Sequence, residues 1–147
     1  MAGMTPWTLT AIDRALRASW AADTCSPDDM ARTPWHPDNP AWGHCDITAL
    51  VVHDIFGGAL VVGEVRLATG ERAGHHWWNL LPADVELDLT REQFRLGQTV
   101  TAPRTLPRPP GPTRRRHDEY VRLRERVASR LGPLPEWPAR RSGDPPG

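Results

Sequence analysis

Apolar residues recur at helical spacing in three stretches of the chain, and each stretch predicts a helix. The first has one apolar face, a threonine at position 8 or 10 that can cap its start, and an expected end near Ala22. The second, over residues 45–56, is apolar on most sides and stops at Gly57-Gly58, which is typical of a central, buried helix. The third, over residues 114–132, is amphipathic and rich in arginine. The apolar positions of the first and third stretches are Leu9, Ile12, Leu16 and Trp20, then Tyr120, Leu123, Val127 and Leu131.

Three shorter runs between these helices predict strands. Residues 59–67, 75–81 and 85–89 are rich in β-branched and aromatic side chains, and turn residues separate them. Residues 82–84 form the tight loop of a hairpin, and Thr90 is expected to cap a short helical turn after it. The pattern therefore predicts an α+β fold in which two helices pack on an antiparallel sheet of at least three strands.

Proline divides the rest of the chain. Residues 23–42 form a loop that four prolines keep from becoming a long helix, and Trp35 and Trp42 indicate that it packs against the body of the protein. Ten of the sixteen prolines lie from Pro103 onwards. We therefore predict a core over residues 1–98, an extended proline-rich linker arm over 99–113, the helix over 114–132, and a flexible tail over 133–147.

Charge and composition exclude some classes of function. The 18 basic residues, all arginine, balance 18 acidic ones, so the chain has no net positive charge that would attract nucleic acid or a membrane surface. Acidic residues interrupt the arginines of 114–130, which favours a solvated helix face that can dock a partner or a second copy in a homodimer. No signal peptide or membrane span is evident, so we expect a cytoplasmic protein whose Cys25 and Cys45 are reduced, although a disulfide between them stays open.

The candidate chemistry lies in Cys45, His76 and Asp88. A thiol at a helix start is a candidate nucleophile, a histidine can take its proton, and a carboxylate can fix the tautomer of that histidine. If 82–84 is a three-residue loop with Asp84 left-handed, Leu81 faces Val85. His76 then lies diagonal to Asp88, on the face of Trp78.

Other interpretations of these residues stay open. A register slip of one residue would bring His75 to Asp88 in place of His76. Cys45 can also be a buried structural thiol, since free cysteines are among the most buried residues. A zinc site built from His44, Cys45, His75 and His76 lacks the usual ligand spacing, so we expect no metal.

The segments WAADTCS, PAWGHCDITALVVHDIFGGALV and HHWWNLLPADVELDLTREQF resemble the YunG-like family of small bacterial proteins over residues 7–96. The order Cys, His, Asp also resembles a minimal papain-like cysteine hydrolase or acyltransferase core, which implies a papain-like fold. Two positions depart from the family pattern. His44 stands where the family usually has Gln, and Asp46, where a small apolar residue is usual, would raise the pKa of the thiol.

Together these observations predict a cysteine-dependent hydrolase or acyl transferase that acts on a small amide, ester or thioester, including peptide-like substrates. Cys45 would be the nucleophile, His76 the base and Asp88 the residue that orients it. No cofactor is expected. The alternative is a non-catalytic binding or structural protein on the same scaffold. The residues expected to bind the oxyanion or the substrate are His44, Trp42, Trp78 and Asn79.

Overall fold

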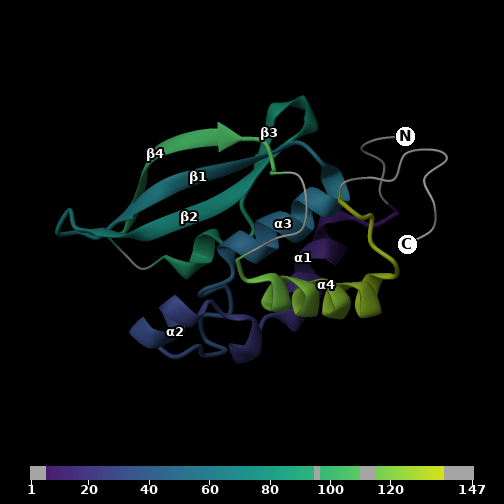
Figure 1. Ribbon diagram of the computed structural model, residues 1–147, viewed down its shortest axis with the longest axis horizontal. Coiled ribbons are helices and arrows are strands. Elements are labelled where there is room, and N and C mark those ends of the chain that lie inside the picture. The colour runs from purple at the N-terminus through teal and green to yellow at the C-terminus, as the bar shows by residue number, and fades with distance from the viewer. Residues whose placement is uncertain (1–5, 95–96, 110–114, 138–147) are drawn as a thin grey trace.

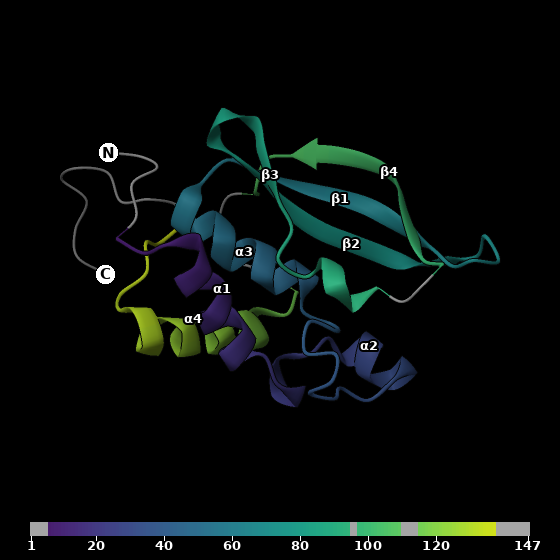
Figure 2. The same ribbon diagram turned by 180° about the vertical axis from the view of Figure 1, so that it is seen from behind.

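A computed structural model of the chain describes residues 6–94, 97–109 and 115–137. A curled antiparallel sheet forms one layer, helix α3 packs beneath it, and α1 and α4 lie side by side on the far side of α3 (Figures 1 and 2). The helices are α1 (Leu9–Ser19), α2 (Pro27–Arg32), α3 (Cys45–Phe56) and α4 (His117–Leu131). The strands are β1 (Ala59–Arg66), β2 (Arg72–Leu81), β3 (Val85–Leu87) and β4 (Thr99–Leu106).

Helix α3 begins and ends at the predicted residues. Its apolar residues face both neighbouring layers, so Ile47, Val51 and Val52 are almost fully buried. Gly57 ends the helix at a φ of 74°, a conformation that costs a glycine little. In α1, Thr8 is the cap and its side chain accepts a hydrogen bond from the backbone N–H of Ala11.

The hairpin between β2 and β3 has the predicted register. Leu81 pairs with Val85, and Asp84 is left-handed with a φ of 60°. The strand itself is shorter than expected, because β3 ends at Leu87. The sheet order is β3-β2-β1-β4, and β3 pairs only with residues 79–81 of β2.

Strand β4 was not anticipated, because its residues were predicted to form part of a linker arm. The arm is extended, as predicted, but residues 99–106 pair with β1 along its length. The proline at position 103 is tolerated because β4 lies at the edge of the sheet, where ladder hydrogen bonds on one side are not needed.

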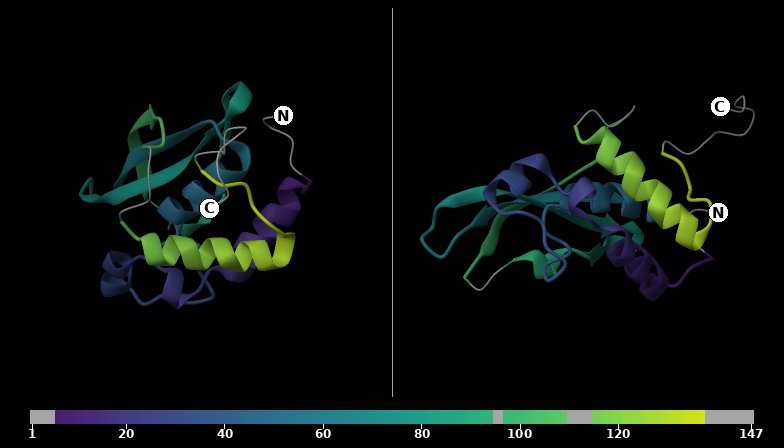
Figure 3. Two further views of the ribbon diagram at one scale, coloured as in Figure 1. Left: turned by 45° about the vertical axis from the view of Figure 1, so that its right-hand side comes forward. Right: turned by 90° about the horizontal axis from the view of Figure 1, so that it is seen from below.

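Helix α4 belongs to the hydrophobic core. Its Leu123 and Val127 are fully buried, and they pack with Ile12 and Leu16 of α1 and Val51 of α3. Figure 3 shows α4 lying along the molecule on the side of α3 that is opposite the sheet. The predicted flexible tail is ordered as far as the description reaches, at Trp137, and Leu134 is buried. The remainder of the predicted tail lies outside the described residues.

A buried ion cluster joins α3 to α4. The carboxylate of Asp54 is fully buried and accepts hydrogen bonds from Arg108 at 2.5 Å, Arg124 at 2.8 Å and the Tyr120 hydroxyl at 2.5 Å. Arg108 follows β4, so the cluster also fixes the chain where it leaves the sheet. None of the helices in the described part of the chain has the length and apolar character needed to cross a membrane.

Candidate functional site

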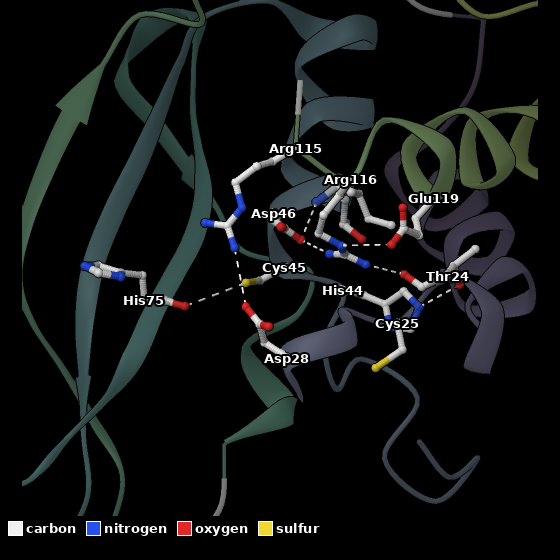
Figure 4. A network of polar contacts seen from close by, with 12 residues as sticks. Thr24, Cys25, Asp28, His44, Cys45, Asp46, His75, Arg115, Arg116 and Glu119 are labelled. Carbon is white, nitrogen blue, oxygen red and sulfur yellow. Dashed lines mark hydrogen bonds and ion pairs between the residues drawn. The ribbon is translucent and has the colours of Figure 1, made fainter. Parts of the chain in front are cut away.

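Cys45 is the first residue of α3, and the turn before it depends on glycine. Gly43 has a φ of 75°, and a Cβ atom there would lie 2.3 Å from the sulfur of Cys25. A larger residue at position 43 would therefore displace the start of α3. The Cys45 Sγ lies 4.0 Å from the backbone carbonyl oxygen of His75, at the edge of β2 that β3 leaves unpaired (Figure 4). Both cysteines are free thiols.

Cys45 lines a cavity with a volume of about 790 Å³. The walls are α2, the start of α3, the first half of β2, and the chain after β4. Near Cys45 they are charged, and along α3 they become apolar. The charged lining residues are Asp28, Asp29, Arg32, Asp46, Arg108, Arg115 and Arg116, and the apolar ones include Ile47, Leu50, Leu60, Trp77 and Leu106.

The surroundings of Cys45 do not activate its thiol. Burial, together with the nearby carboxylate of Asp46, raises the pKa of Cys45 to about 12. A helix N-terminus favours a thiolate, whereas burial of the sulfur, the largest cause of the raised pKa, disfavours it. At neutral pH the side chain is a thiol.

His76 is buried and paired with Asp88. Its Nε2 lies 2.6 Å from Asp88 Oδ2, and its Nδ1 lies 3.0 Å from the side-chain nitrogen of Gln93. The ring of Trp78 stacks on the imidazole with 5.4 Å between centroids. The contact between His76 and Asp88 that the hairpin register predicts is therefore present, with Trp78 on the same face.

The structure does not bring Cys45 to His76. Both ring nitrogens of His76 have other partners, and within the described residues the sulfur makes no hydrogen bond to a histidine ring. Asp88 lines a second, smaller cavity with residues of α1. The alternative base, His75, offers only its carbonyl oxygen to Cys45, because its ring points away (Figure 4). The roles predicted for the three residues stay a prediction.

His44 and Trp42, two of the predicted substrate-site residues, are held by other contacts. The imidazole of His44 is fully buried between the Thr24 hydroxyl, 2.7 Å away, and the carbonyl oxygen of Trp42, 2.8 Å away. Burial lowers the pKa of His44 to about 4, so the ring is neutral at pH 7. The indole N–H of Trp42 donates to the carbonyl oxygen of Thr33.

Asn79 and Trp78, the other two, also lie away from the cavity. Asn79 is buried and donates a hydrogen bond to the carbonyl oxygen of Ala49, which fixes β2 on α3. The indole N–H of Trp78 donates to Glu86. None of the four is among the residues that line the cavity beside Cys45.

Comparison with known proteins gives the family of the chain. The model of the family described as YunG protein matches residues 8–132. The chain belongs to the YunG protein family. No curated protein and no solved structure matches it. The match extends beyond the core that the sequence motifs indicated and includes β4 and α4.

Two arginines of this YunG-family chain were not predicted to take part in a site. Arg116 was assigned to a solvated helix face, yet its side chain is only 7% exposed and pairs with Asp46 and the carbonyl oxygen of Thr24 (Figure 4). The side chain of Arg115 pairs with Asp28 at 3.4 Å, and both residues line the same cavity as Cys45 (Figure 4). Little in the sequence signals the pair of Arg116 and Asp46, because Asp46 is partly exposed and its partner lies far along the chain.

No group of three or more potential metal ligands occurs in the YunG-family chain over the residues that are described. Of the set considered from the sequence, His44 is hydrogen-bonded to Thr24 and His76 to Asp88, and His75 presents its carbonyl oxygen to Cys45. The expectation of no metal rests on the sequence argument and stays a prediction.

Proposed function

We propose that this protein binds a small molecule in the cavity beside Cys45. One observation carries the proposal: Cys45 opens onto a cavity of about 790 Å³, while the histidine that would activate it faces Asp88 and Gln93. The volume lies within the range of small-molecule sites, and the mixture of apolar and charged walls is typical of them. This is the non-catalytic alternative that the sequence left open.

The thiol of Cys45 supports binding better than catalysis. A thiol with a pKa near 12 supplies almost no thiolate at neutral pH, and a nucleophilic cysteine needs a base within hydrogen-bond reach. In a binding site the same side chain is a small, polarisable wall residue. Cys45 lies where the cavity wall changes from charged to apolar residues, and a small side chain with both characters fits there.

A cysteine-dependent hydrolase or acyl transferase on a papain-like scaffold is the second candidate. The preassembled pair of His76 and Asp88 favours it, because catalytic imidazoles are oriented in this way. The reaction would require the start of α3 to move until the sulfur lies within about 4 Å of a His76 nitrogen. It would also require the hydrogen bond from Gln93 to break.

Two substitutions of Cys45 test whether the cavity is the binding site. In a fluorine-NMR fragment screen, we expect Cys45→Ser to keep the fragments that the native protein binds, because the cavity is unchanged. Cys45→Phe puts a phenyl ring into the end of the cavity at the start of α3 and should weaken the fragments that bind at that end. If Cys45→Phe binds every fragment with native affinity, the fragments do not occupy the space beside Cys45 and the proposal fails.

The pH dependence of alkylation tests the thiol directly. Iodoacetamide should label Cys45 slowly at pH 7, and the rate should rise about tenfold per pH unit up to pH 10, because only the thiolate reacts. His76→Ala should leave the rate unchanged. Rapid labelling below pH 7 that slows in His76→Ala would overturn the binding proposal in favour of the enzyme, as would hydrolysis of nitrophenyl esters that Cys45→Ser abolishes.

A further inference from the structure

We infer that the contact between His53 and Arg108 is an acid-sensitive latch, which opens when His53 takes up a proton. His53 lies in the last turn of α3, and Arg108 follows β4 and lines the cavity beside Cys45. The latch therefore joins the end of α3 to one wall of that cavity. The latch itself does not depend on the proposed function, and only its effect on a ligand rests on it.

The partners of the His53 ring require the ring to be neutral. Its Nε2 lies 3.2 Å from the backbone carbonyl oxygen of Gly58, which can only accept a hydrogen bond, so Nε2 carries the proton. Its Nδ1 lies 3.4 Å from Nη1 of Arg108, and because a guanidinium can only donate, Nδ1 is the acceptor. A second proton would have to bind Nδ1, where it would point at the guanidinium.

The charges around His53 also disfavour a second proton. His53 is buried, and the charged groups that face it are Arg108, from the chain after β4, and Asp54, from its own helix. From α4, Arg124 and Tyr120 bind the same carboxylate of Asp54, so one acid already pairs with two arginines. Burial and the charge of Arg108 lower the pKa of His53 by more than Asp54 raises it.

A protonated His53 would therefore have to separate from Arg108. Nη1 of Arg108, the atom beside His53, also donates to the carbonyl oxygen of Leu50 at 3.3 Å and to Asp54 at 2.5 Å. Displacement of this guanidinium weakens those bonds and changes the wall of the cavity that Arg108 lines. A ligand that fits the closed wall binds only while the latch is closed, so acid should weaken its binding.

Trp137 is a natural probe of the latch because its indole contacts both partners. The indole lies at 84° to the imidazole of His53 with 4.6 Å between centroids, and the guanidinium carbon of Arg108 lies 5.8 Å from its ring centroid. Trp137 carries no charge, so the C-terminal segment adds no charged group of its own to the latch through this ring. A change in the distance between His53 and Arg108 therefore changes the surroundings of the indole.

Fluorine NMR of the full chain, labelled with 5-fluorotryptophan, tests the latch, and Trp137→Phe assigns the resonance. As the pH falls from about 7 to about 4.5, we expect the Trp137 resonance to shift with a midpoint below about 6.5, the pKa of an ordinary histidine. In His53→Gln the amide can accept from Arg108 and donate to Gly58 without titrating, so the resonance should stay fixed. The matched control is His36→Gln, because His36 is exposed and should not affect the shift.

Two further measurements use the native chain. The Cε1–H signal of the His53 ring should titrate with the same midpoint as the Trp137 resonance, which tests the latch even if His53→Gln does not fold. Circular dichroism over the same pH range checks that the chain stays folded. At that midpoint a fragment that binds the cavity should bind about twofold more weakly than at neutral pH, because half of the molecules are open.

The outcomes separate the latch from the proposed function. A Trp137 resonance that does not move in the folded native chain, or that moves equally in His53→Gln, would overturn the latch. Fragments that bind equally well while the Trp137 resonance shifts would overturn its coupling to the cavity. If no fragment binds at any pH, the proposed function fails, whereas a Trp137 shift that His53→Gln abolishes still supports the latch.

Discussion

At the scale of single residues, buried histidines in this protein serve the structure. His44 stands directly before Cys45, where a hydrogen-bond donor to an oxyanion was expected. Its two ring nitrogens instead join Thr24 to Trp42 and so hold the loop of residues 23–42 against the start of α3. His76 does the same between β2 and the turn that contains Gln93. Both rings are fully engaged in holding loops in place.

The buried His44 makes stability depend on pH. Its pKa is about 4 in the folded protein and about 6.5 in the unfolded chain, so only the unfolded chain takes up its proton as the pH falls from 6.5 to 4. The free energy of unfolding should therefore fall in this window, by up to about 1.4 kcal/mol per pH unit. Urea unfolding at a series of pH values measures it.

A substitution assigns this effect to His44. In His44→Gln the amide can still donate to Trp42 and accept from Thr24, and it does not titrate, so the dependence should become shallower. His36→Gln, in the exposed part of the loop, is the control and should keep the native profile. An unchanged profile in His44→Gln would show that His44 is not the group responsible.

At the scale of elements, the helices and strands that the sequence predicted are those whose pattern lies in neighbouring residues. Helix α3 is apolar on most sides and stops at two glycines, so both of its ends were predictable. The loop of residues 82–84 fixed the hairpin register and with it the contact between His76 and Asp88. Strand β4 was missed because Pro103 interrupts it and a proline-rich segment follows it, and only pairing with β1 makes it a strand.

The site was less predictable than the fold for the same reason. Cys45 and His76 are on adjacent elements, but whether their side chains meet depends on which edge of β2 faces the start of α3. The buried Arg116 pairs with Asp46, which is 70 positions away in the sequence. No local pattern encodes either fact.

Asp54 is the residue through which α3, β4 and α4 depend on one another. In Asp54→Asn the buried guanidinium of Arg108 and that of Arg124 lose their counter-charge, and we expect a loss of about 3–5 kcal/mol in the free energy of unfolding. The control is Asp23→Asn, because Asp23 also binds an arginine of α4, Arg126, but is half exposed. It should cost less than about 1 kcal/mol. Equal losses in urea denaturation would contradict this account.

At the scale of the whole molecule, the protein has one core, and α4 is part of it. The sequence predicted a core that ended at residue 98, followed by an arm and a separate helix. In the structure, Leu123 and Val127 of α4 are buried against α1 and α3, and residues 99–106 complete the sheet. The family match over residues 8–132 includes all of these parts.

This arrangement predicts the effect of truncation. A chain that ends at residue 113 lacks α4, so it loses Leu123, Val127 and the arginine that binds Asp54 from that helix. Removing one buried leucine side chain already costs about 2–5 kcal/mol, and a domain of this size has about 5–15 kcal/mol of stability in total. We therefore expect the truncated chain to show no cooperative unfolding in urea and to expose apolar surface that binds a hydrophobic dye.

A chain that ends at residue 137 keeps α4 and Leu134, and it should unfold in one transition near the native midpoint. Cooperative unfolding of the shorter chain at that same midpoint would mean that residues 6–109 form a core without α4, and that the helix docks on it as a separate unit.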